Sequence, residues 1–555
     1  MDIRRTILWM IFVFSVFAIW NNWQTYNGQP SLFGQAPQSE TTSNPASGTP
    51  GVPNAATPAG TASTPSTAAP AVASEKITIT TDVFKLNFDS IGAQIVYAEL
   101  LKYPSTENRD QPIVLLDNSP TAEYIVQSGL VAPQGINKRY PDQNTPFRMV
   151  STETTMTGDT LPVVFESESD GIKVTRTYTF HRNSYRIDVK DEVTNTATES
   201  QSPSLYLQIA RDSQDPAGSS SFYPTFTGMA VYSDEERFQK VSFSEIDKKN
   251  ADYVKSADDG WISVIQHFFV TAWVPEEGKE RYIDMRKVSN SLYAISAVEP
   301  LGNIAPNSTV ATQSTLWIGP QDQKALAAIS PSLDLVVDYG WLTILAKPMF
   351  TFMTWLHSLV GNWGWTIVLL TVIIKLILYP LSASSYRSMA KMKNVAPRMQ
   401  ALKEKYGDDR QKLNTAMMEM YRTEKINPLG GCFPILIQIP VFLTLYRVLL
   451  SSVEMRDAGW IGWITDLSAR DPYFILPAIM MATMFLQIKL NPTPPDPMQA
   501  RIMMLMPLVF GAMMFMFPAG LVLYWVVNNI LSIAQQWYIT RNMNKAANDA
   551  ILTHK

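Results

Sequence analysis

The feature that most constrains this chain is a series of apolar segments that begins near residue 355. A helix needs about 20 consecutive apolar residues to cross a bilayer, and these segments approach or reach that length. An amphipathic segment at 331–354 precedes them and is expected to lie along the membrane interface. We predict five membrane-spanning helices, at 355–380, 431–451, 471–489, 501–517 and 519–540.

A sixth apolar run lies at the N-terminus, where Arg4 and Arg5 precede the segment Ile7–Trp20. A signal peptide has an apolar core of similar length, but no cleavage site of small residues follows this run. We favour an uncleaved membrane anchor over residues 1–23, with a cleaved signal as the alternative. Residues 24–74 are rich in Pro, Ala, Thr and Ser, a composition that predicts a flexible linker.

Residues 75–330 show the period-two alternation of β-strands. The pattern is clear in Lys76–Phe88, Gly171–Phe180 and Tyr185–Val193, and Gly, Asn, Asp and Pro turns separate such runs. We therefore predict a large all-β sandwich domain. Its two histidines, His181 and His267, lie far apart in the sequence, so we predict no metal site and no cofactor.

The charge is divided between the two halves of the chain. Residues 71–340 carry a net charge of −13, and residues 341–555 carry +9. A chain that binds nucleic acid throughout is not divided in this way, so we predict no DNA-binding role. Cytoplasmic loops of membrane proteins are enriched in Lys and Arg. This rule places both termini and the segments 381–430, 490–500 and 541–555 in the cytoplasm, with 75–330 and 452–470 outside.

The cytoplasmic segment 381–430 predicts a hairpin of two helices, Ser384–Lys405 and Asp409–Lys425, with Gly407 between them. Methionine recurs along both helices, at positions 389, 392, 399, 417, 418 and 420. A hairpin packed on itself explains this stripe. A deformable surface for varied partners explains it equally well, because Met side chains repack easily.

Polar residues inside the predicted spans are the strongest functional signal. Lys375 lies in an apolar helix with Thr371 one turn earlier, and none of the five C-terminal spans holds an acidic residue in its interior to pair with it. Snorkelling of Lys375 to the cytoplasmic interface is the structural alternative. Gln438 lies in the next span, and the last span carries a polar stripe. The stripe consists of Tyr524, Asn528, Ser532 and Gln535.

Together these residues predict a hydrated cavity in the inner leaflet, although hydrogen bonding between helices also explains the stripe. No nucleotide-binding, protease or hydrolase motif is present in the sequence, so we predict that the chain is not an enzyme. Two other classes remain as alternatives. An ion-coupled transporter requires an acidic partner for Lys375 and inverted repeats. A membrane-anchored sugar-active enzyme requires clustered carboxylates within 76–330.

Two long motifs resemble the YidC membrane protein insertase family in its Gram-negative form. One is Asn427-Pro-Leu-Gly-Gly-Cys-Phe-Pro-Ile-Leu-Ile-Gln-Ile-Pro-Val-Phe, and the other is Phe517-Pro-Ala-Gly-Leu-Val-Leu-Tyr-Trp. The resemblance implies an inner-membrane insertase and chaperone that acts alone or with the Sec translocon. It also implies a five-helix core around a hydrophilic groove that is closed on the outside.

By motif, Lys375 falls where the family carries its groove cation, and Tyr524 and Trp525 match an aromatic pair of the last span. Trp525 lacks the phenolic hydroxyl that relatives often have there. The implied partners are newly made membrane proteins, the lipid bilayer, and a ribosome or targeting factors at the hairpin and tail. The residues predicted to line the groove are Lys375, Thr371, Gln438, Pro440, Tyr524, Trp525, Asn528 and Ser532.

Overall fold

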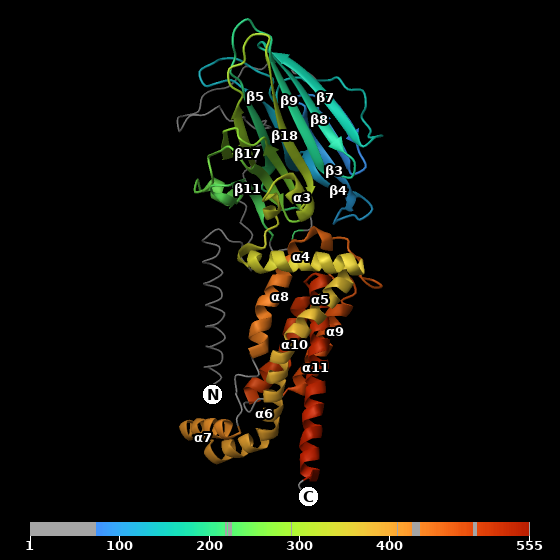
Figure 1. The fold of residues 1–555 in the computed structure, drawn as a ribbon, viewed down its shortest axis with the longest axis vertical. Coiled ribbons are helices and arrows are strands. Elements are labelled where there is room, and N and C mark those ends of the chain that lie inside the picture. The colour runs from blue at the N-terminus through green and yellow to red at the C-terminus, as the bar shows by residue number, and fades with distance from the viewer. Residues whose placement is uncertain are drawn as a thin grey trace. The chain divides into compact units, whose positions relative to one another are not determined.

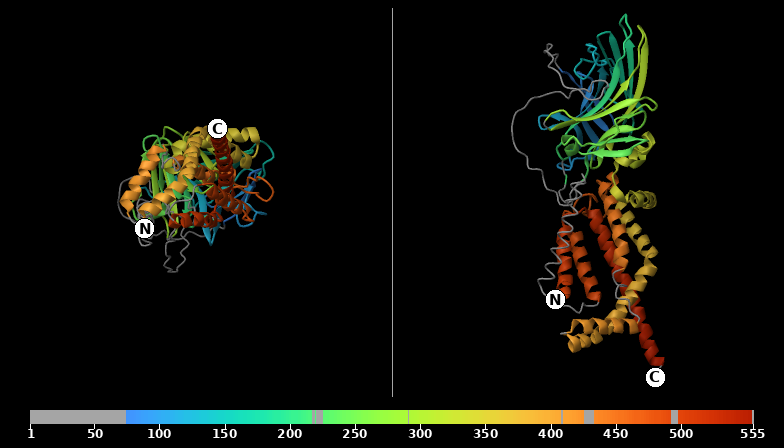
Figure 2. Two further views of the ribbon diagram at one scale, coloured as in Figure 1. Left: turned by 90° about the horizontal axis from the view of Figure 1, so that it is seen from below. Right: turned by 90° about the vertical axis from the view of Figure 1, so that its left-hand side faces the viewer.

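The computed structural model describes residues 74–553 except 217–218, 220–224, 290, 408, 425–432 and 492–496. The predicted anchor at 1–23 and all but the last residue of the predicted linker lie outside the described residues. The chain forms two compact units, which divide between Asp338 and Tyr339 (Figures 1 and 2).

The first unit contains two nine-stranded antiparallel sheets, which confirms the predicted β-sandwich. The first sheet has the order β1 (Lys76–Thr80), β2 (Phe84–Asp89), β3 (Gln94–Pro104), β4 (Pro112–Ser119), β5 (Ala122–Val131), β10 (Ser204–Asp212), β17 (Leu292–Pro300), β16 (Arg281–Lys287), β13 (Ser256–Ala257). The second has the order β12 (Arg237–Val241), β11 (Thr227–Ser233), β14 (Trp261–Gln266), β15 (Phe269–Pro275), β18 (Thr309–Pro320), β9 (Arg186–Asn195), β8 (Ile172–His181), β7 (Thr160–Ser169), β6 (Arg148–Met149).

The alternation of the sequence decides which side of each strand is buried. Along β8, every second residue from Ile172 to Phe180 is buried, and the residues that alternate with them are only partly covered. The same buried face carries one charge, Arg176, whose guanidinium lies 2.6 Å from the Asp191 carboxylate of β9. Arg176 also donates to the Ser128 carbonyl of β5, 3.1 Å away, so this buried ion pair joins the two sheets.

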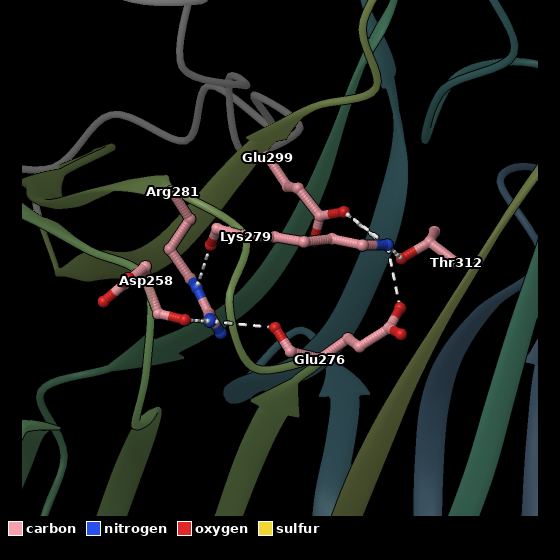
Figure 3. A network of polar contacts seen from close by, with 6 residues as sticks. All are labelled: Asp258, Glu276, Lys279, Arg281, Glu299 and Thr312. Atoms are coloured by element: carbon pink, nitrogen blue, oxygen red, sulfur yellow. Dashed lines mark hydrogen bonds and ion pairs between the residues drawn. The ribbon is translucent and has the colours of Figure 1, made fainter.

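A second polar link between the sheets surrounds Lys279, in the turn between β15 and β16 (Figure 3). Its ammonium contacts Glu276 at 2.8 Å and Glu299 at 3.2 Å, and donates to the Thr312 hydroxyl of β18 at 3.0 Å. Burial favours the neutral amine, but the two carboxylates outweigh it and raise the pKa of Lys279. Beside it, Arg281 holds the backbone carbonyls of Asp258 and Glu276. Because two carboxylates neutralise Lys279 and backbone carbonyls hold Arg281, we assign the network a structural role.

Three short helices complete the first unit: α2 (Phe243–Asp247), α3 (Gln323–Ile329) and η1 (Leu333–Val336). Ser242 caps α2, and the Glu245 carboxylate accepts a hydrogen bond from the Ser242 backbone N–H, which completes a capping box. The carboxylate of Asp247 then receives hydrogen bonds of 2.8 Å from Lys287 and from Tyr293. These contacts fix α2 against β16 and β17.

The second unit is helical, as predicted. It consists of η2 (Gly340–Leu342), α4 (Thr343–Val360), α5 (Trp363–Ile377), α6 (Tyr379–Tyr406), α7 (Arg410–Thr423), α8 (Phe433–Ser451), η4 (Val453–Met455), α9 (Ile475–Leu490), α10 (Pro497–Met514) and α11 (Ala519–Thr553). Judged by length and composition, no single described helix reaches a full membrane span, whereas α4 and α5 do so as a pair bent by 118°. The number of membrane-spanning helices stays a prediction.

The helix boundaries differ from the predicted ones in two places. Residues 355–360 belong to α4, and the chain turns at Gly361 (φ 71°) and Asn362 before α5 begins. Gly361 adopts the left-handed conformation that ends a helix, and Asn362 caps the next one by accepting from the Trp365 amide. At the other end, α11 continues to Thr553 instead of stopping at 540 (Figure 1).

The predicted hairpin at 381–430 matches α6 and α7, which lie against each other. Met399 is buried at their contact, where the Tyr421 hydroxyl lies 2.9 Å from the Met399 sulfur. An ion pair of 2.7 Å between Arg398 and Glu424 closes the contact at the surface. The methionine stripe therefore serves, at least in part, to pack the hairpin on itself.

The segment 452–471 is tied to the starts of two helices. Asn362, at the start of α5, donates to the Gly459 carbonyl at 3.0 Å. The amides of Ala519 and Gly520, at the start of α11, donate to the carbonyls of Ala469 (2.7 Å) and Leu467 (2.9 Å). These bonds satisfy backbone groups that a helix start leaves without partners.

Candidate functional site

A cavity of about 120 Å³ lies within the helical unit. This volume has room for several water molecules, and most of the residues that line it carry polar groups. Five helices contribute to it: α5, α6, α8, α9 and α11. The lining residues are Thr371, Ile374, Lys375, Leu378, Leu381, Ser382, Ser385, Tyr386, Met389, Gln438, Gln487, Asn491, Tyr524, Asn528 and Ser532.

Lys375 is the only charged side chain among these described lining residues. It is 8% exposed, and its ammonium donates a 2.7 Å hydrogen bond to the Ser532 hydroxyl of α11. Ser532 in turn donates to the Asn528 carbonyl one turn earlier, also at 2.7 Å. Since no Asp or Glu is among the described lining residues, this charge is held by a neutral partner.

A second polar bridge connects α8 to α11. The amide nitrogen of Gln438 donates to the side-chain oxygen of Asn528, which is buried. Thr371 also lines the cavity but donates its hydroxyl proton to the Ile367 carbonyl of its own helix at 2.7 Å. The hydroxyl oxygen of Thr371 therefore serves the cavity only as an acceptor.

Only one residue of the predicted aromatic pair lines the cavity. Tyr524 lines the cavity and is 1% exposed. Trp525 is not among the lining residues, and its ring lies 4.7 Å from that of Phe442 and 5.2 Å from that of Phe510. Neighbouring residues of a helix point about 100° apart, so both rings cannot face one cavity. Pro440 is exposed on α8 and is also not among the lining residues.

Two parts of the wall are not among the residues that the sequence predicts to line the groove. On α9, Thr483, Gln487 and Asn491 follow one another at four-residue spacing, and the last two line the cavity. Thr483 accepts a 3.2 Å hydrogen bond from Asn529, and Asn491 accepts one of 3.0 Å from Gln536. The four-residue spacing on a short apolar helix is the signal that would have found this stripe.

The other part is the beginning of α6, which contributes Ser382, Ser385, Tyr386 and Met389. It starts two residues after α5 ends, with Pro380 in its first turn. An apolar cluster of Ala383, Tyr386 and Ile539 packs this part of α6 against α11. No pattern in the sequence predicts this contact, because the charge of the segment assigns it to the cytoplasm.

The outward surface of the helical unit is apolar, in contrast to the cavity, which most of its lining residues make polar. Large apolar side chains are exposed on α4, α5, α9, α10 and α11. A soluble protein rarely leaves so much apolar surface uncovered, and a lipid environment accounts for it. Among the described residues, no group of three His, Cys, Asp or Glu side chains is placed to hold a metal ion.

Known protein families match both the β-sandwich unit and the helical unit. Residues 76–352 match the family described as YidC periplasmic domain, and residues 355–546 match the family described as 60Kd inner membrane protein. The protein named membrane protein insertase YidC of Bordetella parapertussis is 63% identical over 559 residues, covering 99% of both chains. That of Cupriavidus metallidurans is 47% identical over 561 residues, covering 99% of this chain and 100% of the relative.

Among solved structures, a crystal structure of an active YidC insertase with its first transmembrane domain resolved covers 84% of this chain. The match covers 93% of that structure at 19% identity, with a TM-score of 0.39. The sequence relatives define the class as bacterial inner membrane proteins with an exported β-sandwich. Within that class, this chain belongs to the YidC membrane protein insertase family. Its relatives are named as insertases, and not as enzymes of metabolism.

Proposed function

We propose that this chain inserts newly made proteins into the bacterial inner membrane by way of the cavity around Lys375. The observation that carries the proposal is the buried ammonium of Lys375, bonded to the neutral hydroxyl of Ser532. A charge inside a bilayer costs about 2.5–3.5 kcal/mol on insertion scales, so it is retained where it meets water or a partner. An acidic or polar tail of a substrate supplies such a partner.

The energetics of transfer require no nucleotide. Water in the cavity and the Lys375 charge shorten the apolar path that a polar tail must cross. The apolar helix of the substrate then moves sideways into lipid, which releases about 0.8 kcal/mol for each CH₂ group buried. The membrane potential contributes about 2.3 kcal/mol per charge per 100 mV and draws an acidic tail outward.

We propose six membrane spans, with both termini in the cytoplasm and residues 75–330 in the periplasm. The five C-terminal spans correspond to α5, α8, α9, α10 and α11. We propose that α4 lies in the interface, because its outer side exposes Ile344, Trp355 and Leu359 to the extent of 84%, 54% and 65%. Apolar side chains so exposed on a helix suit the boundary of a bilayer.

We further propose that the protein acts both alone and beside the Sec translocon, and that it chaperones the folding of its substrates. The α6–α7 hairpin, with the tail of α11, is the proposed docking surface for a ribosome or targeting factors. Its support is an excess of Lys and Arg in 381–430, with ten basic and five acidic residues, together with exposed methionine such as Met418.

Insertion into proteoliposomes by the wild type, Lys375→Ala and Lys375→Arg tests the proposal. The substrate is a single-span protein whose translocated tail is either acidic or neutral. We expect only the alanine variant to fail, and chiefly with the acidic tail. Lys489→Ala, which removes an exposed charge of α9, is the matched control. Equal insertion by all variants would leave Lys375 as a structural residue and overturn the charge mechanism.

A further inference from the structure

Two oxygen atoms beside the cavity have no hydrogen-bond partner among the described residues. One is the hydroxyl oxygen of Ser385 on α6, and the other is the amide oxygen of Gln535 on α11. Both atoms are buried, and Ser385 as a whole is 4% exposed. Buried polar groups are nearly always paired, so each exception calls for an explanation. We call these two atoms the acceptor pair.

The orientation of the Gln535 amide follows from its one contact. Its nitrogen donates to the backbone carbonyl of Lys375 at 3.4 Å, near the end of α5. A carbonyl oxygen only accepts hydrogen bonds, so the nitrogen of Gln535 must face it. The oxygen of Gln535 is therefore directed elsewhere, and it cannot be exchanged with the nitrogen without losing this contact.

Ser385 belongs to the wall of the cavity, and Gln535 contacts the lining residue Lys375 through its amide nitrogen. Ser385 lines it directly, together with Ser382 one turn earlier on α6. Gln535 follows the lining residue Ser532 by three positions, which puts the two side chains on the same face of α11. The cavity thus has the charged donor of Lys375 and, separately, neutral acceptors near the α6–α11 contact.

The amide oxygen of Gln535 can only accept a hydrogen bond, and the hydroxyl of Ser385 can also accept one, so a group that bonds to both oxygens must supply donors. An α-helix in a membrane satisfies its backbone N–H groups internally, whereas an extended segment presents them unpaired. We propose that the oxygens of Ser385 and Gln535 accept hydrogen bonds from backbone N–H groups of an extended substrate segment. The cavity would then bind the polypeptide backbone of the translocated tail itself, whatever the charge of its side chains. This inference rests on the proposed function and adds a subsite to it.

Insertion assays with two neutral tails test the inference. One tail is rich in Ser and Asn, and the other is polyproline, which has no backbone N–H donors. We expect Ser385→Ala and Gln535→Met each to lower insertion of the first tail about fivefold, the worth of one lost hydrogen bond. The same variants should leave insertion of the Pro-containing tail unchanged. Ser385→Thr, which keeps the hydroxyl, should retain wild-type insertion.

The matched control is Ser384→Ala, because Ser384 is the exposed neighbour of Ser385 on the same helix. Wild-type insertion of the Ser/Asn tail by Ser385→Ala would mean that water alone occupies the acceptor pair, and would overturn the inference. An equal loss with both tails would also overturn it, since a general defect in the cavity would then explain the result.

A crosslinking experiment answers the same question without depending on activity. The chain has a single cysteine, Cys432, so Ser385→Cys in a Cys432→Ser background gives one reactive thiol. A stalled substrate with one cysteine in its tail should form a disulfide with this variant and not with Ser384→Cys. Failure to crosslink, or equal crosslinking at both positions, would contradict a tail bound at Ser385.

The two proposals fail in different ways. Loss of insertion in Ser385→Ala but not in Lys375→Ala would remove the charge mechanism and keep the backbone subsite. Loss in Lys375→Ala alone, limited to acidic tails, would keep the charge mechanism and remove the subsite.

Discussion

The ammonium of Lys375 lies 2.7 Å from the hydroxyl oxygen of Ser532, although 157 residues separate them in the sequence. The proton of that hydroxyl is directed to the Asn528 carbonyl, so Ser532 meets Lys375 purely as an acceptor. This contact joins α5 to α11 inside the cavity. It also fixes the position of the Lys375 ammonium group.

Removal of the Ser532 hydroxyl should therefore loosen this contact. We expect Ser532→Ala to lower the stability of the detergent-solubilised protein by about 1–2 kcal/mol, because a hydrogen bond from a charged group is lost. Ser532→Thr keeps the hydroxyl and should melt near the wild type. Thermal unfolding followed by tryptophan fluorescence measures both. A melting temperature of Ser532→Ala equal to that of the wild type would show that water replaces the hydroxyl without cost.

The packing of Gly364 predicts a second effect. A Cβ atom at this position would lie 2.3 Å from the ring of Trp460, far inside contact distance. We expect Gly364→Ala to destabilise the protein by about 1–3 kcal/mol, as other overpacked sites do. Gly459→Ala, where the nearest atom would be 3.4 Å away, is the control and should have a smaller effect. Similar melting temperatures for the two variants would contradict the predicted clash.

The ion pair between Arg176 and Asp191 is buried, with side chains 0% and 1% exposed. Arg176→Met leaves a carboxylate buried without its partner, and such a loss typically costs about 3–5 kcal/mol. The pair Lys190–Glu192 is 44% and 40% exposed, so Lys190→Met should cost less than about 1 kcal/mol. Urea unfolding of the full chain should separate the two variants clearly. Comparable losses of stability in the two variants would mean that the buried ion pair stabilises the fold little more than the exposed pair does.

The contact of Asp247 with Lys287 predicts a dependence on pH. The hydrogen bond from Lys287 holds the pKa of Asp247 below its usual value, and the same bond raises the pKa of Lys287. A lowered carboxyl pKa stabilises the fold above the unfolded value of about 3.9, and this stability is lost as the pH falls through the folded pKa. On the alkaline side, the contribution is lost as the pH rises through the raised pKa of Lys287.

Asp247→Asn should therefore be slightly less stable than the wild type at pH 7, by under about 1 kcal/mol for so exposed a pair. The difference should shrink as the pH falls below about 3.9. Melting temperatures measured between pH 2 and pH 7 give the test. A difference that stays constant over this range would exclude the ion pair as its source.

The sequence predicted those parts of the site that follow a helical period within one segment. The spacing of Asn528 and Ser532 placed them on one face of the last helix, and both line the cavity. Lys375 was notable because a charge is rare in an apolar run. The polar stripe that begins on α9 and ends at Asn491 is not predicted, because the helix is short. The role of these residues is apparent only from their hydrogen bonds to α11.

The contribution of α6 could not be predicted in the same way. Its charges assign it to the cytoplasm, and only the contact with Ile539 brings Ser385 to the cavity wall. The helix boundary at Gly361 and Asn362 shows a different limit. Both residues are ordinary signals for ending and starting a helix, but the apolar run on either side concealed them.

The length of α11 has a mechanical consequence. Its 35 residues form one helix of about 52 Å, which extends past α9 and α10 (Figures 1 and 2). Ser532 lies about 20 Å along this helix from Ala519, which is held by the Ala469 carbonyl. A tilt of about 5° around that point moves the Ser532 hydroxyl by about 1.7 Å, enough to break its contact with Lys375. A displacement of α11 where Ile539 touches α6, about 30 Å along the helix from Ala519, would therefore also change the wall of the cavity.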